Sequence, residues 1–327
     1  MLQFLFRRFI YMIVTLLAIS IVGFIIIQLP PGDYLTSYIA ELKASGQEVS
    51  QSEVESLRRR YGLNQPAYLR YFTWMKNMLR GDFGVSFRWN RPVNELIGER
   101  LALTATVSLV TISFAYIVAI VLGIYAAVYQ YGVGDYFLTA WAFIGLATPN
   151  FLLALVLMFL FYKFFGWSVV GLFSPDYVNA SWSLAKFVDL LKHLPVPVLV
   201  IGTASVAGLF RIMRSSLLDE LQKQYVTTAR AKGLSEMKLL FKYPIRVALN
   251  PVVSTLTWTF PQIVSGGALV AIVLGLPTMG PLLLQALKTQ DMYLAGTLMI
   301  FISFFTVMGT LISDLLLLWM DPRIKME

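Results

Sequence analysis

The chain has 327 residues, of which 57% are hydrophobic and only 13% are charged. A soluble domain carries about 25% charged residues, so this composition excludes an ordinary soluble protein and predicts a membrane protein. The formal net charge of +8 favours basic loops at a membrane surface over nucleic-acid binding. Because cysteine is absent, the chain has no disulfide framework and no thiolate metal site.

Apolar runs of about 20 residues can cross a bilayer as helices, and six such spans can be drawn. They cover residues 9–28, 101–129, 136–163, 194–212, 251–274 and 293–319. The first run is long and has no small-residue cleavage site, so we interpret it as a first span and not as a signal peptide. The predicted fold class is an all-α polytopic membrane protein, organised as a first span (1–28), a loop (29–100) and a five-helix core (101–327).

The basic residues predict the orientation of the chain. Arg7 and Arg8 precede the first span without any acidic residue. The loop 213–249 is also rich in lysine and arginine, and short cytoplasmic loops carry such an excess. Both termini and this loop are therefore predicted to be cytoplasmic, and the loops 29–100 and 164–193 to lie outside.

Several local signals predict where helices begin, end and bend. In the first outer loop, "VSQSEVESLRRRYG" is predicted to be helical, with Ser50 or Ser52 as its cap and Gly62 as its stop. The pair Asn250-Pro251 is predicted to cap and start the fifth span. Pro149 and Pro261 lie inside the third and fifth spans and are expected to kink them.

The loop 213–249 has the pattern of two helices joined by a turn. Residues 217–232 contain neither proline nor glycine and favour one helix, and Gly233 can adopt the positive φ of a helix C-terminus. Ser235 can cap a second helix, "EMKLLFKY", which ends before Pro244. Its apolar residues fall near one face: Leu234, Met237, Leu240 and Phe241. Such a face either docks in the groove of a partner protein or lies on the lipid surface.

The sequence lacks the motifs of the common enzyme classes. It contains no phosphate-binding GxxxxGK[ST] stretch and no HExxH stretch, and its one histidine, His193, lies at a predicted membrane boundary. No nucleophile–base pair suggests catalysis, so the chain is predicted to be no enzyme and to bind no cofactor or metal. Ionisable residues are scarce within the spans, which argues against an ion-coupled secondary transporter, although that class stays an alternative.

Several segments together resemble one family. The stretch "YVTTARAKGL" resembles the coupling-loop motif of ATP-binding-cassette importer permeases, in particular of the oligopeptide/dipeptide/nickel branch. The start "FLFRRFIYMIVTLLAISIVGFIIIQLPPGD", the stretch "YGLNQPAYLRYFTWMKNMLRGDFGVSF" and the end "SDLLLLWMDPRI" are similar to its B-type subunit. The chain departs from the family's general Glu-Ala-Ala pattern at residues 227–229, which are Thr-Thr-Ala. It also lacks the acidic residue that the branch has after "GGA" at 266–268.

This resemblance implies a type I importer permease in a bacterial inner membrane, which moves oligopeptides by alternating access. Because of the missing acidic residue, oligosaccharides stay an alternative solute. The implied partners are a second homologous permease, two cytoplasmic ATP-binding subunits that hold ATP and Mg, and an external solute-binding protein. The residues implied in coupling to the ATPase are Thr228, Ala229, Arg230, Ala231, Lys232, Gly233, Leu234, Met237, Leu240 and Phe241. The expected candidates for the translocation pathway are Trp258, Gln262, Ser265 and Ser303, because Gln262 stands beside a carbonyl freed by Pro261.

Overall fold

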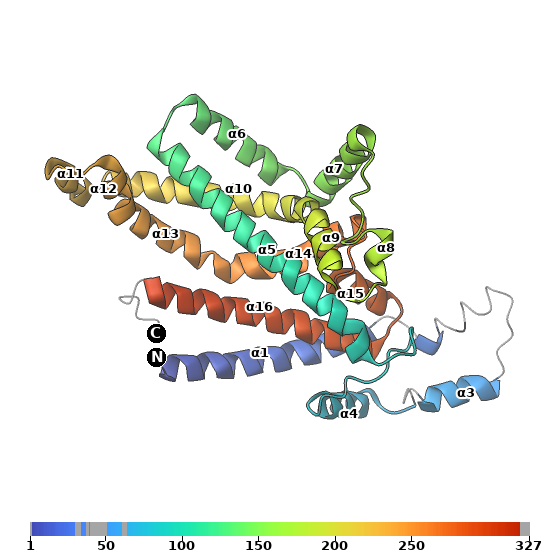
Figure 1. The fold of residues 1–327 in the computed structure, drawn as a ribbon. Coiled ribbons are helices and arrows are strands. Elements are labelled where there is room, and N and C mark those ends of the chain that lie inside the picture. The colour runs from blue at the N-terminus through green and yellow to red at the C-terminus, as the bar shows by residue number, and fades with distance from the viewer. Residues whose placement is uncertain (1, 30–33, 37–38, 40–50, 61–63, 321–327) are drawn as a thin grey trace. The chain divides into compact units, whose positions relative to one another are not determined.

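The structure, a computed structural model, describes the chain except residues 1, 30–33, 37–38, 40–50, 61–63 and 321–327. Its described part is almost wholly helical (Figure 1). The helices are α1 (Leu2–Gln28), α3 (Gln51–Arg60), α4 (Ala67–Met78), α5 (Val93–Val128), α6 (Val133–Ala147), α7 (Asn150–Phe165), α8 (Pro175–Val178), α9 (Leu184–His193), α10 (Pro195–Leu221), α11 (Gln224–Ala231), α12 (Glu236–Lys242), α13 (Pro244–Ser254), α14 (Leu256–Val273), α15 (Met279–Lys288) and α16 (Met292–Met320).

The predicted spans correspond to helices of sufficient length and hydropathy to cross a membrane. Among the described residues, five single helices meet this condition, in α1, α5, α10, α14 and α16. A sixth span results if α6 and α7, which meet at an angle of 106°, are counted together. The predicted helix in the first outer loop is present as α3, while Ser50 and Gly62 lie outside the described residues. The all-α polytopic fold class is therefore confirmed.

Pro149 causes the sharp bend between α6 and α7. The residue before it, Thr148, has an extended backbone with φ −87° and ψ 121°, as expected because a proline disfavours the helical conformation of its predecessor. The predicted kink at Pro149 is thus confirmed as a complete break in the helix. Pro261, in contrast, lies inside α14, which is continuous from Leu256 to Val273.

Three predicted boundaries are wrong. α5 begins at Val93 and not at Leu101, and α10 continues to Leu221. Asn250 is no helix cap, because Pro251 lies inside α13, which begins with Pro244 instead. A proline costs no hydrogen bond in the first turn of a helix, and Pro244 occupies that position. Pro251 has no backbone N–H to donate to the preceding turn of α13.

The chain divides into two compact units, which are described separately. Unit 1 contains residues 1–104 and 278–305. Its core surrounds Trp74 of α4, which is buried and stacks on Phe24 of α1 with ring centroids 6.5 Å apart. Asp291, directly before α16, is also buried. Its carboxylate accepts hydrogen bonds from the hydroxyl of Ser86 at 2.5 Å and from the backbone N–H of Leu294 at 3.2 Å. These bonds fasten the loop around Ser86 to the start of α16.

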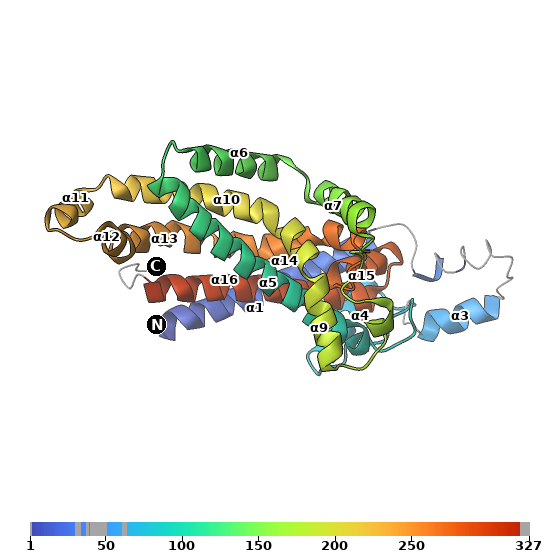
Figure 2. The same cartoon turned by 45° about the horizontal axis from the view of Figure 1, so that its top comes forward.

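Unit 2 contains residues 105–277 and 306–327, and α10 lies at its centre. Figures 1 and 2 both draw α6 and α13 alongside α10, and these helices are in contact. On α10, Phe210, Met213 and Leu217 are fully buried. α5 approaches them closely at Gly123, where a Cβ atom would lie 2.8 Å from the side chain of Met213. Small residues at such crossings let membrane helices pack against one another.

Candidate functional site

The loop between α10 and α13 forms the two short helices α11 and α12 of unit 2. Figures 1 and 2 place both helices beyond the ends of α10 and α13. The predicted continuous helix over 217–232 is wrong, because α10 ends at Leu221 and α11 begins at Gln224. Lys223 between them has an extended backbone with φ −73° and ψ 147°. The break lets α11 turn so that Val226 and Ala229 are buried against Leu239 of α12.

Gly233 makes the turn between α11 and α12. Its φ is +78°, in the left-handed region that glycine tolerates, as predicted. The backbone N–H of Gly233 donates to the carbonyl of Arg230 at 3.0 Å, and that of Leu234 donates to Ala229 at 3.4 Å. Ser235 occupies the predicted cap position of α12, although its side chain makes no capping hydrogen bond.

An exposed ion pair closes the same turn. Arg230 Nε donates to Glu236 Oε1 at 2.6 Å, and Nη2 donates to Oε2 at 3.1 Å. This bidentate pairing lowers the pKa of the Glu236 carboxyl, because the hydrogen bonds favour its ionised form. The pair therefore fixes the start of α12 against the end of α11.

The apolar residues of α12 divide between two environments. Leu240, which the helical pattern had placed on the docking face, is buried in the core of unit 2 together with Leu217 of α10 and Ile245 of α13. Leu240 is therefore unavailable to a partner. Met237 and Phe241, one helical turn apart, are 66% and 60% exposed and form the outward apolar pair. Four cations of the same loop are also exposed, namely Arg230, Lys232, Lys238 and Lys242.

The other predicted coupling residues fall into three groups. Ala229 is buried inside the loop and Leu234 is half-buried against the same cluster. Thr228 is exposed, and its hydroxyl donates to the carbonyl of Gln224 at 2.9 Å. Ala231 and Gly233 are exposed without large side chains. Of the predicted coupling residues, the large apolar side chains that a partner can reach are therefore Met237 and Phe241.

The predicted pathway residues belong to two units of the chain, which are described separately. Trp258 and Gln262 are exposed on α14, one turn apart. The side chain of Ser265 lies outside the described part of the chain. Ser303 belongs to unit 1, and its hydroxyl donates to the carbonyl of Met299 in its own helix at 2.7 Å. The role of these four residues in a pathway stays a prediction.

A buried ion pair between α6 and α10 was not predicted from the sequence. Arg214 Nε donates to Asp135 Oδ1 at 2.6 Å, and Nη2 donates to Oδ2 at 2.7 Å. Asp135 is 2% exposed and also accepts the backbone N–H of Tyr131 at 3.0 Å. The two partners are 79 residues apart in the sequence, so no local pattern could connect them. The pair fixes the start of α6 to the carboxyl-terminal end of α10.

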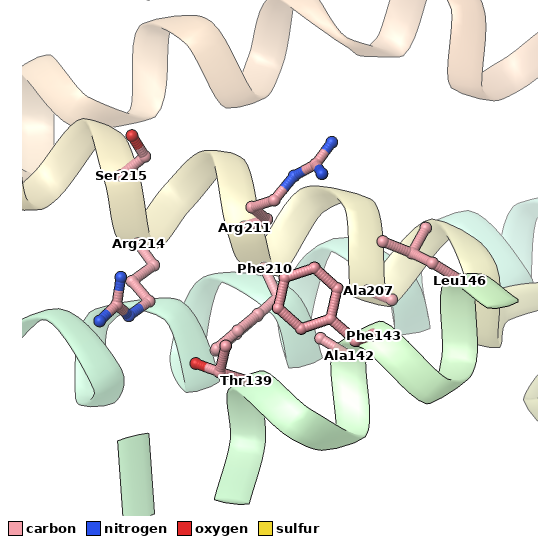
Figure 3. Close-up of a pocket in the computed structure, with 9 residues that line it drawn as sticks. All are labelled: Thr139, Ala142, Phe143, Leu146, Ala207, Phe210, Arg211, Arg214 and Ser215. Atoms are coloured by element: carbon pink, nitrogen blue, oxygen red, sulfur yellow. The ribbon is translucent and has the colours of Figure 1, made fainter. Parts of the chain in front are cut away.

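A cavity of about 260 Å³ lies between the same two helices (Figure 3). Figure 3 shows Arg211 directed to one side of α10 and Arg214 to the other. The lining residues are Thr139, Ala142, Phe143, Leu146, Ala207, Phe210, Arg211, Arg214 and Ser215. Apart from the arginines, the lining offers two hydroxyl groups and apolar side chains.

The chain is similar to known proteins over almost its whole length. Residues 119–326 match the family described as "Binding-protein-dependent transport system inner membrane component", and residues 1–110 match the amino-terminal region of such membrane components. The chain is 35% identical to the oligopeptide transport system permease protein AppB of Bacillus subtilis, with 99% of this chain and 100% of the relative covered. It is 32% identical to the oligopeptide transport system permease protein OppB of Haemophilus influenzae, with 99% and 100% covered. It is 30% identical to the dipeptide transport system permease protein DppB of Alkalihalophilus pseudofirmus, again with 99% and 100% covered.

Proposed function

Because the chain belongs to the family of inner-membrane components of binding-protein-dependent transport systems, we propose that it is the permease subunit of an ATP-driven importer of oligopeptides. It is a multi-pass membrane protein of the inner membrane. The observation that carries the proposal is the exposed pair Met237 and Phe241 on α12, in a loop that also exposes four cations. A short apolar helix face of this kind fits the groove of a partner protein.

In this proposal the chain supplies the channel and another protein supplies the energy. Two cytoplasmic subunits bind ATP and Mg, and a second homologous permease completes the pathway. A solute-binding protein delivers the solute from outside. ATP favours one of two packed states because the closed ATPase pair binds it more tightly, and α12 transmits that closure to the spans. The basic amino terminus and the basic loop 213–249 support a cytoplasmic location of both termini and of α12.

The proposed solute class follows the names of the relatives, which include oligopeptide and dipeptide permeases. The missing acidic residue after Gly266-Gly267-Ala268 keeps oligosaccharides as the competing class. Uptake of a labelled tripeptide into intact cells distinguishes the two. We expect unlabelled oligopeptides to compete and oligosaccharides to have no effect. Uptake of a labelled oligosaccharide without uptake of the tripeptide would overturn the peptide proposal.

The coupling proposal is tested by Gly233→Val. A β-branched residue at φ +78° costs about 1–2 kcal/mol and shifts α12 away from its partner. We expect the protein to reach the membrane, while uptake falls and the ATP-binding subunits no longer co-purify. Gly81→Val is the matched control, because Gly81 has φ +82° and, like Gly233, nothing within 4 Å of an added Cβ.

Both variants carry the same backbone strain, but only Gly233 lies in the loop 213–249 that we propose contacts the ATP-binding subunits. At matched membrane levels, the Gly81 variant should therefore keep its uptake and its ATP-binding subunits. Normal uptake and normal co-purification for Gly233→Val would show that α12 lies on the lipid surface, and the coupling proposal would be wrong.

A further inference from the structure

The helix α9 carries an unusually apolar exposed face. Four large side chains, at Leu184, Phe187, Val188 and Leu191, follow the spacing i, i+3, i+4 and i+7, which places them along one side of the helix. They are 80%, 48%, 42% and 49% exposed, in that order. No charged residue interrupts this stripe. The feature was not predicted from the sequence, which had indicated only turns in the loop 164–193.

The opposite face of α9 carries buried charges. Lys186 is 7% exposed, its ammonium group donates to the carbonyl of Ala180 at 2.7 Å, and it lies 4.9 Å from the ring centroid of Phe173. Asp189 is equally buried and accepts the backbone N–H and the hydroxyl of Ser174, each at 2.7 Å. The chain itself therefore satisfies both charges. A helix on the surface of a soluble protein has the reverse pattern, with its apolar side inward.

The position of α9 places it at a membrane boundary. It ends at His193, and Pro195 already begins α10, which is long and apolar enough to cross the membrane. Figures 1 and 2 both draw α9 at a steep angle to α10, so it does not prolong the span. Two exposed tryptophans, Trp167 and Trp182, lie in the segment that joins α7 to α9. Tryptophan is enriched at the level of the lipid headgroups.

We propose that α9 is an interfacial helix. Its apolar face is inserted among the acyl chains of the phospholipid leaflet at the amino-terminal end of α10, and consists of Leu184, Phe187, Val188 and Leu191. An outward apolar face with inward charges is stable where the surroundings are hydrocarbon. A solute-binding protein that docks and departs would leave this face in water for part of each cycle. Such transient interfaces are also no more apolar than an ordinary protein surface. Lys192, exposed in the last turn of α9, can reach the headgroups.

Spin labels on single cysteines test this proposal, and the natural absence of cysteine makes the labelling specific. Phe187→Cys and Val188→Cys are labelled in the full chain, reconstituted in phosphatidylcholine–phosphatidylglycerol bilayers with the subunits that co-purify with it. Collision with oxygen, which concentrates in lipid, is compared with collision with a water-soluble nickel chelate. Asn179→Cys, exposed in the same loop, is the control for a site in water.

We expect frequent oxygen collisions and few nickel collisions at positions 187 and 188, with the ratio reversed at 179. Frequent nickel collisions at 187 and 188 would mean that the face lies in water, and the proposal would be wrong. Few collisions with either reagent would mean that a protein covers the face, which also overturns it. Leu191→Cys repeats the measurement one turn away, so a local defect at one position does not decide the result.

Discussion

The short helices α9 and α12 both lie outside the spans of unit 2 and both expose apolar side chains, but their charges are arranged in opposite ways. α9 exposes four large apolar residues along one side of the helix and buries Lys186 and Asp189. α12 exposes only Met237 and Phe241, buries Leu239 and Leu240, and keeps its cations in solvent. The contrast indicates two kinds of surroundings. A broad apolar face without charge suits lipid, and a small apolar pair on a helix with exposed cations suits a groove in a protein.

The largest expected effect comes from the inner face of α12. Leu239 is fully buried against Val226 and Ala229, so Leu239→Ala leaves a cavity and costs about 2–5 kcal/mol. We expect the melting temperature of the purified protein to fall by several degrees. Met237→Ala is the control on the exposed face and should leave that temperature unchanged. Equal melting temperatures for the two variants would contradict the division of α12 into an inner and an outer face.

The outer face of α12 should act on binding and not on stability. Phe241→Ala removes a side chain that is exposed in this chain and that we propose is buried in the ATPase, which is worth about 1.5–3 kcal/mol. The affinity for the ATP-binding subunits should therefore fall roughly ten- to a hundredfold. Phe187→Ala, the equivalent change on α9, should leave this affinity unaltered. A titration of each purified variant with the ATP-binding subunits measures both, and equal losses would remove the distinction between the helices.

The smallest expected effect concerns pH. Burial raises the pKa of Asp189, but the two hydrogen bonds from Ser174 outweigh it, so the pKa of this carboxyl lies below its usual range. A lowered pKa in the folded state contributes stability above the ordinary value of about 3.9, and this stability is lost as the pH falls through the lowered pKa. The protection of the α9 amides against hydrogen exchange should accordingly decrease only below about pH 4. Ser174→Ala should move that change to higher pH.

The ion pair between Arg230 of α11 and Glu236 of α12 provides a contrast to this prediction. The pKa of Glu236 is also lowered, but the pair is fully in solvent, where salt screens it. Raised salt concentration should therefore affect exchange in α12 and leave α9 unchanged. Protection of α9 that is constant from about pH 6 to pH 3 would contradict the role given to Asp189.

Much of the fold could be predicted from the sequence because its signals are local. Apolar runs of sufficient length marked the spans, and Pro149 marked the break in the third. Gly233 marked the turn of the loop, since its position after a helix calls for a positive φ. The motif "YVTTARAKGL" led to the family that the comparison then confirmed.

The features that were missed depend on contacts between distant residues. Asp135 and Arg214 pair across 79 residues, and each alone looks like an ordinary loop charge. The break at Lys223 contains no proline or glycine and follows from the burial of Val226 against Leu239. Leu240 could not be assigned to the inner face, because the helical period places it near Phe241 on the helix. The two residues differ only because Leu240 packs into the core of unit 2.

The comparison between α9 and α12 is tested most directly by placing one photoreactive amino acid at Met237 and, in a second variant, at Phe187. Both variants are irradiated in the membrane with all subunits present, and the adducts are identified by mass spectrometry. The account predicts an adduct with an ATP-binding subunit from position 237 and an adduct with phospholipid from position 187. A lipid adduct from position 237 without any protein adduct would contradict it.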